Sequence, residues 1–96
     1  MSRALVERRL SDVASQLKEL RRELSVTDEQ LAHLADEAED ARLRSLVSET
    51  PIADREHREA SRHAEAMSRH RDDVVASISR LEVLQDELLD KLLDAS

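Results

Sequence analysis

Apolar residues recur along the first half of the chain in alternating steps of four and three, which is the spacing of a heptad seam. The seam positions are Val6, Leu10, Val13, Leu17, Leu20, Leu24, Thr27, Leu31, Leu34, Ala38 and Ala41. Only Thr27 is polar. Because this spacing places the series on one side of an α-helix, it predicts a helix over residues 2–47.

The second half repeats the pattern, with polar side chains at His57, Arg71 and Gln85. Its seam positions are Ala53, His57, Ala60, Ala64, Met67, Arg71, Val74, Ile78, Leu81, Gln85, Leu88, Leu92 and Ala95. The series predicts a second helix over residues 51–94.

A turn is predicted at residues 48–51, between the two series. Pro51 suits the first position of a helix, where no backbone N–H is required. Thr50 then occupies the N-cap, and Asp54 lies near the positive end of the new helix. A short connection makes the two helices antiparallel neighbours.

The two seams also agree in register when the chain folds back at this turn. Positions at equal sequence distances from residue 49 then face each other, and every layer pairs an a position with a d position. The layers include Ala41–His57, Ala38–Ala60, Leu31–Met67, Thr27–Arg71, Leu17–Leu81, Leu10–Leu88 and Val6–Leu92. Arg71 is expected to send its guanidinium out of the seam to Glu23 or Asp28. We therefore predict an all-α fold, one long antiparallel two-helix coiled-coil hairpin over residues 1–96.

The segment Ser25–Gln30 allows a second interpretation of the first helix. Thr27 and Gln30 have the spacing of a capping box, which would divide the helix in two. The heptad phase continues through this segment and no Gly or Pro enforces a stop, so we favour a continuous helix.

The second helix carries more apolar residues near its C-terminus than one partner helix can cover. Val75, Val83, Leu84, Leu89 and Leu93 lie outside the seam. Isolated apolar side chains are normal on any surface, but a patch of them usually marks an interface. We predict a homodimer that forms a four-helix bundle at the open end of the hairpin. Its predicted interface is Val75, Ile78, Leu81, Leu84, Leu88, Leu89, Leu92 and Leu93.

A second group of apolar and acidic residues surrounds the turn. Its members are Leu43, Leu46, Val47, Glu49, Ile52, Asp54 and Glu56. The apolar members either close the hairpin or form a docking point, and we treat the set as candidate docking residues for an unidentified partner protein.

The composition of the chain argues against several classes of function. The chain has no Gly, Cys, Phe, Trp or Tyr, and 39% of its residues are charged, which is typical of a coiled coil. A net charge of −7 argues against binding to nucleic acid or to an anionic membrane. The N-terminus lacks the apolar region of a signal peptide, and no apolar run approaches a membrane span, so we expect a cytoplasmic protein. Frequent Ala, and Arg in place of Lys, suggest a GC-rich bacterial genome.

No group of residues indicates catalysis or metal binding. The four His residues have none of the short spacings of metal motifs. A two-helix fold offers the many carboxylates no pocket that would shift their pKa values. We therefore expect no enzyme activity, cofactor or metal, and predict an interaction or adaptor protein that acts through protein–protein contacts.

Residues 41–81 resemble the N-terminal hairpin of Gre-type transcript-cleavage factors. The matching features are Ala41-Arg42, an acidic tip and His57-Arg58-Glu59-Ala60. Those factors carry acidic tip residues that hold a metal in the RNA polymerase channel, and the nearest counterparts here are Glu49, Asp54 and Glu56. This chain lacks the family's Gly-Asp and Glu-Asn tip signature and its second domain. The resemblance implies an alternative function, a regulator that inserts its tip into a large enzyme such as RNA polymerase, and assigns no catalytic residue.

Overall fold

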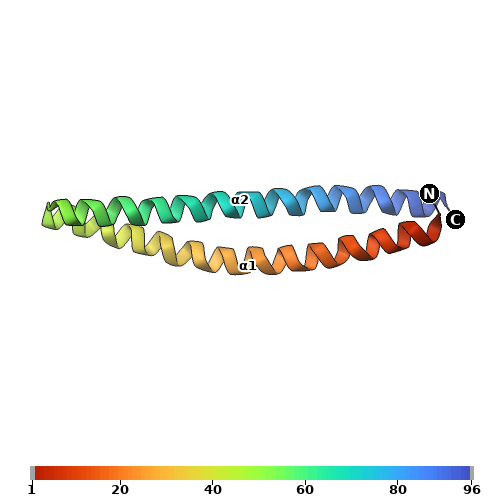
Figure 1. The fold of residues 1–96 in the computed structure, drawn as a ribbon, viewed down its shortest axis with the longest axis horizontal. Coiled ribbons are helices and arrows are strands. Elements are labelled where there is room, and N and C mark those ends of the chain that lie inside the picture. Colours follow the sequence, from red (N-terminus) through yellow and green to blue (C-terminus); the bar gives the residue numbers. More distant parts are fainter. Residues whose placement is uncertain (1, 96) are drawn as a thin grey trace. The chain divides into compact units, whose positions relative to one another are not determined.

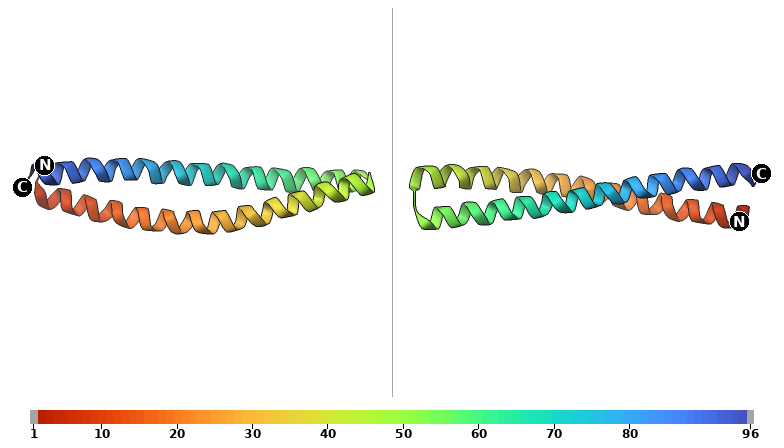
Figure 2. Two further views of the ribbon diagram at one scale, coloured as in Figure 1. Left: turned by 180° about the vertical axis from the view of Figure 1, so that it is seen from behind. Right: turned by 90° about the horizontal axis from the view of Figure 1, so that it is seen from above.

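The computed structural model describes residues 2–95, which form two α-helices, α1 (Arg3–Ser48) and α2 (Pro51–Asp94). The helices are antiparallel and pack against each other, and both termini lie at the same end (Figures 1 and 2). The predicted all-α helical hairpin is therefore confirmed. Residues 1 and 96 of the predicted hairpin lie outside the described residues. The pairing of two hairpins into a four-helix bundle stays a prediction.

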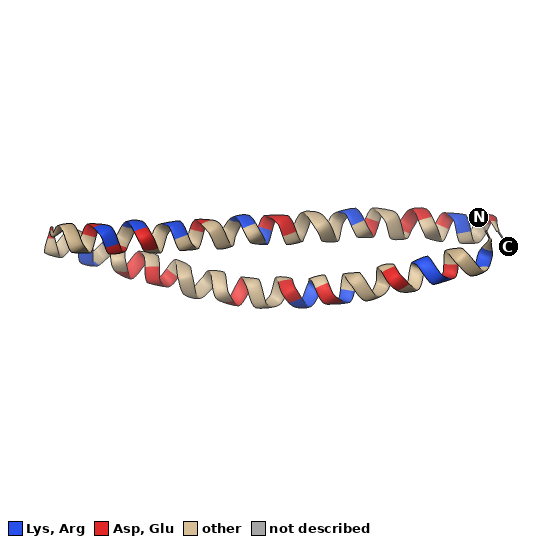
Figure 3. Ribbon diagram, in the orientation of Figure 1, with Lys and Arg blue, Asp and Glu red and all other residues tan. Residues whose placement is uncertain are grey.

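The described chain divides into two compact units. The open-end unit comprises Met1–Leu24 and Asp73–Ser96, and the tip unit comprises Ser25–Asp72. Acidic and basic residues are distributed along both helices in each unit (Figure 3).

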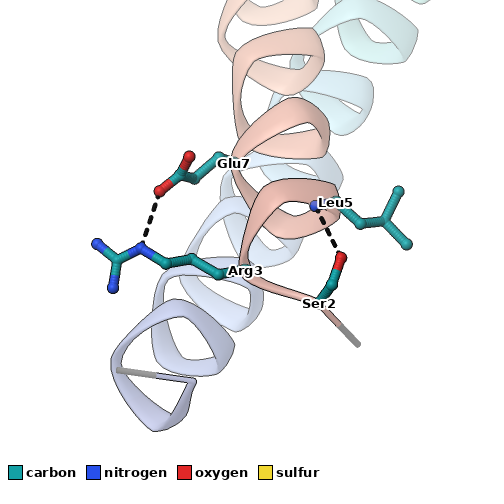
Figure 4. A network of polar contacts seen from close by, with 4 residues as sticks. All are labelled: Ser2, Arg3, Leu5 and Glu7. Atoms are coloured by element: carbon teal, nitrogen blue, oxygen red, sulfur yellow. Dashed lines mark hydrogen bonds and ion pairs between the residues drawn. The ribbon is translucent and has the colours of Figure 1, made fainter.

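Helix α1 begins at Arg3 because Ser2 caps it. The Ser2 Oγ accepts a hydrogen bond of 3.2 Å from the Leu5 backbone N–H, and the Ser2 carbonyl accepts one of 3.1 Å from the Val6 N–H. Arg3 and Glu7, one turn apart, form an exposed ion pair of 3.0 Å (Figure 4). The helix thus starts one residue later than predicted.

The turn is tighter than the predicted residues 48–51, since only Glu49 and Thr50 lie outside both helices. Glu49 has a φ of 51°, the left-handed conformation that ends many helices, and its N–H donates to the Ser45 carbonyl at 3.0 Å. Thr50 caps α2 as predicted, because its Oγ1 accepts a 3.2 Å hydrogen bond from the Ala53 N–H.

The heptad seam is confirmed residue by residue in α1. Every predicted seam residue from Val6 to Ala41 is buried or half-buried, and the only other residue of α1 that is not exposed is Ser45, the next seam position. The helix runs through Thr27, whose side chain is 2% exposed, without a break. The capping-box interpretation is therefore wrong, because the buried seam position outweighs the local capping signal.

The seam of α2 is equally well defined. Every predicted position from Ala53 to Leu92 is buried or half-buried, whereas Ala95, beyond the end of the helix, is exposed. Three residues of α2 outside the seam are also half-buried: Ser61, Ser77 and Leu84.

The large buried side chains belong to the open-end unit. Its core is formed by Val6, Val13, Leu17, Val74, Ile78 and Leu88, with partly buried Leu10, Leu20, Leu24, Leu81, Leu84 and Leu92 packed against it. Full burial of such a side chain contributes about 1.5–3 kcal/mol. The buried positions of the tip unit hold smaller side chains, those of Thr27, Ala41 and Ala53.

Candidate interaction surfaces

The tip of the hairpin exposes large apolar side chains. Leu43 is 48% exposed, Leu46 62%, Val47 86% and Ile52 72%. Leu43, Leu46 and Val47 follow the i, i+3, i+4 spacing, so they form one stripe on the outer side of α1. Ile52 adds a fourth side chain from the first turn of α2. We call these four residues the tip patch.

The tip patch is exposed because small residues close the seam beneath it. Ala41 and Ala53 are 2% and 7% exposed, and Ser45 is half-buried. The larger apolar side chains of this region point away from the seam and therefore do not close the hairpin. Their role as a docking surface stays a prediction.

Two of the acidic residues predicted for docking serve the turn itself. Asp54 Oδ1 accepts a 2.6 Å hydrogen bond from the Ser45 hydroxyl, which joins the two helices across the turn. The backbone of Glu49 supplies the left-handed residue of the connection. Glu56 instead lines a shallow groove of the tip unit with Glu37, Asp40, Ala41, Arg44 and Ala60.

One exposed ion pair stands close to the tip patch. The Arg42 guanidinium donates two hydrogen bonds to the Glu39 carboxylate, at 2.7 and 3.0 Å. These hydrogen bonds hold the pKa of the Glu39 carboxyl below its ordinary value and raise that of Arg42. Both groups therefore stay charged around neutral pH, beside the exposed leucines.

Half of the interface predicted in the open-end unit lies in the core of the hairpin. Leu88 is 1% and Ile78 9% exposed, and Leu81 and Leu92 pack against the same core. Their side chains serve the contact between α1 and α2 in this unit. The accessible members are Val75, Leu84, Leu89 and Leu93.

Helix geometry distributes these accessible residues over two sides of α2. At about 100° per residue, Val75 and Leu89 lie along one edge of the seam and Leu84 along the opposite edge. Leu84 lines two adjoining grooves. One is formed with Gln16, Leu20, Ser77, Arg80 and Leu81, and the other with Ser79, Arg80, Val83 and Glu87.

Sequence reasoning missed Arg80 and Glu87 as members of this surface. The heptad pattern distinguishes only seam positions from all others, and both residues lie outside the seam. The feature of the sequence that could have identified them is the spacing 80, 83, 84, 87. Four residues with this i, i+3, i+4, i+7 spacing surround the space that a side chain of a facing helix can enter.

Residues 2–95 contain neither a metal-binding cluster nor a membrane-spanning helix. No group of three or more His, Asp or Glu side chains in this range is placed to hold a metal ion. Neither helix, over the same range, contains a stretch apolar enough to cross a membrane.

Comparison with known proteins gives no family. No protein-family model matches the chain, and no curated protein or solved structure matches it either.

Proposed function

We propose that this protein is a non-enzymatic interaction or adaptor protein, which docks the tip of its hairpin into another protein. The observation that supports the proposal is the tip patch, where Leu46, Val47 and Ile52 are 62%, 86% and 72% exposed. The seam is already closed at this place, and exposed apolar patches of this kind often mark interaction sites.

The shape of the tip patch indicates the kind of partner. Three of its members form one stripe on α1, which is how an amphipathic helix fits an apolar groove. The partner we propose is therefore a folded protein with an apolar groove, and we place the encounter in the cytoplasm, in keeping with a chain that has no Cys.

Site-specific photocrosslinking tests the proposal. A photoreactive amino acid replaces Val47 at the tip, or Val26, a 48% exposed residue on the outer side of α1 within the same unit, as a matched control. We expect one discrete adduct from position 47 and none from position 26, in extracts of cells that express the protein.

Competition with unlabelled chain tests whether the crosslinking is specific to the tip patch. Excess unlabelled native chain should abolish the adduct, and excess of the Val47→Ser/Ile52→Ser double variant should leave it. Equal adducts from positions 47 and 26, or equal competition by the variant, would show that the tip patch is not a docking surface.

A further inference from the structure

Four residues of α2 form a diamond on the outer side of the open-end unit. Arg80, Val83, Leu84 and Glu87 have the i, i+3, i+4, i+7 spacing that forms the hole for a side chain of a facing helix. They line one groove together with Ser79, and Arg80 and Leu84 also line the adjoining groove. None of the four belongs to the tip patch, so the inference goes beyond the proposed function and does not depend on it.

The centre of the diamond is apolar and accessible. Val83 is 58% exposed, and Leu84 is half-buried where it packs against the core. A facing helix would cover both side chains.

The two ends of the diamond carry opposite charges that the hairpin leaves unused. The Arg80 guanidinium donates a 3.0 Å hydrogen bond to the Ser77 hydroxyl, one turn earlier. Within the described part of the chain, neither Arg80 nor Glu87 forms an ion pair. Other charged side chains of this unit do pair between the two helices; Arg21, for example, lies 3.6 Å from Glu82.

The diamond is self-complementary about a two-fold axis. Arg80 and Glu87 are equally far from the midpoint between Val83 and Leu84. When a second α2 packs antiparallel across that midpoint, Val83 meets Leu84 of the second copy, and each Arg80 meets a Glu87. We propose that a second copy of this chain occupies this surface, in an isologous contact of α2 with α2.

Charges farther from the two-fold axis restrict how the two α2 helices can pack. The same symmetry would bring Asp73 of one copy opposite Asp94 of the other if the helices ran alongside each other for their full length. Like charges at such positions are unfavourable, so the two helices should cross at the diamond and diverge beyond it. Leu89 and Leu93 stay outside this contact, which differs from the wider interface predicted from the sequence.

Charge reversal tests the proposal with the full-length chain. Light scattering over a range of protein concentrations should give the native protein a mass of twice the 10.9 kDa of the chain. Arg80→Glu and Glu87→Arg should each raise the dissociation constant by at least about tenfold, because each places like charges at both ends of the diamond. The double variant Arg80→Glu/Glu87→Arg should recover the native mass.

A mixture of the two single variants tests the charge pairing directly. The Arg80→Glu chain and the Glu87→Arg chain are complementary to each other, so an equimolar mixture should give dimers that neither variant forms alone. Arg22→Glu, the same charge change at an exposed position of α1, is the matched control and should keep the native mass. Circular dichroism should show unchanged helix content in all variants.

Three results would overturn the proposal: a monomeric native protein up to several hundred micromolar, a dimer that both single reversals leave intact, or a mixture that stays monomeric. The tip crosslinking does not depend on these residues, so its outcome separates failure of the self-contact from failure of the proposed function.

Discussion

At the scale of single residues, the connection between the helices depends on the backbone of Glu49. Its φ of 51° lies in the left-handed region, which is unfavourable for a residue with a side chain and favourable for Gly. The sequence contains no Gly, so the chain accepts this strain in its turn.

Replacing Glu49 by Gly should therefore stabilise the hairpin by about 1 kcal/mol. Glu49→Ala is the control, since it removes the same charge but keeps Cβ and the strain. We expect urea unfolding to show a gain for the Gly variant only. An equal gain for both variants would assign the effect to the charge instead of the backbone.

Arg71 is the second residue whose role the structure explains. Its side chain, expected to reach Glu23 or Asp28, makes an ion pair with Asp28 through Nε. Both side chains remain partly exposed, at 39% and 47%, so solvent weakens the pair.

The aliphatic stem of Arg71 should contribute more to the free energy of unfolding than its charge. Arg71→Met keeps most of the stem and should change the free energy of unfolding by less than about 1 kcal/mol. Arg71→Ala also removes the stem from a half-buried seam position, and should destabilise the protein more, by about 1–2 kcal/mol. Thermal unfolding of both variants distinguishes the two contributions, and a larger loss in the Met variant would contradict this ranking.

At the scale of the helices, stability depends on the large apolar layers of the open-end unit. Leu17 is 1% exposed, and its truncation leaves a cavity between α1 and α2 in this unit. Leu17→Ala should therefore destabilise the protein by about 2–5 kcal/mol. Val26→Ala, at an exposed position of α1, should stay within about 0.5 kcal/mol. Chemical unfolding measures both, and similar losses would show that the seam does not bury Leu17.

Both helices and the buried seam of each could be predicted because the heptad pattern is a local property that repeats. Pro51 and Thr50 fixed the start of α2 for the same reason. The end of α1 moved by one residue, since no side chain enforces a stop and the cap is formed by the backbone of Glu49. The role of Thr27 was harder to predict, because its capping signal indicates a break in the helix whereas its seam position indicates a continuous one.

The two candidate interaction surfaces could be predicted only in part from the sequence. The apolar residues of the tip could be identified, but their exposure depends on Ala41, Ser45 and Ala53, which close the seam without them. The residues around Leu84 could be identified as a surplus. Their distribution over two sides of α2 depends on the rotation per residue. The groove that Arg80 and Glu87 line together with Leu84, on which the proposed self-contact depends, required the structure.

At the scale of the whole molecule, the residues that form the core differ from those proposed for docking. The core lies in the open-end unit, whereas the tip patch contributes no buried side chain. Val47→Ser/Ile52→Ser should therefore leave the unfolding midpoint unchanged while it abolishes tip crosslinking. A marked loss of stability in this variant, read from circular dichroism, would indicate that the tip patch closes the hairpin after all.

Methyl nuclear Overhauser effects test the antiparallel register of α1 and α2 most directly. In protein with ¹³C-labelled Leu and Val methyl groups, cross-peaks should connect Leu17 with Leu81 and Leu10 with Leu88. Samples that mix labelled and unlabelled chains identify the peaks that arise within one chain. Intrachain peaks from these pairs would confirm the register on which both proposed surfaces depend. Peaks from Leu10 to Leu81 in their place, a displacement of one heptad, would contradict it.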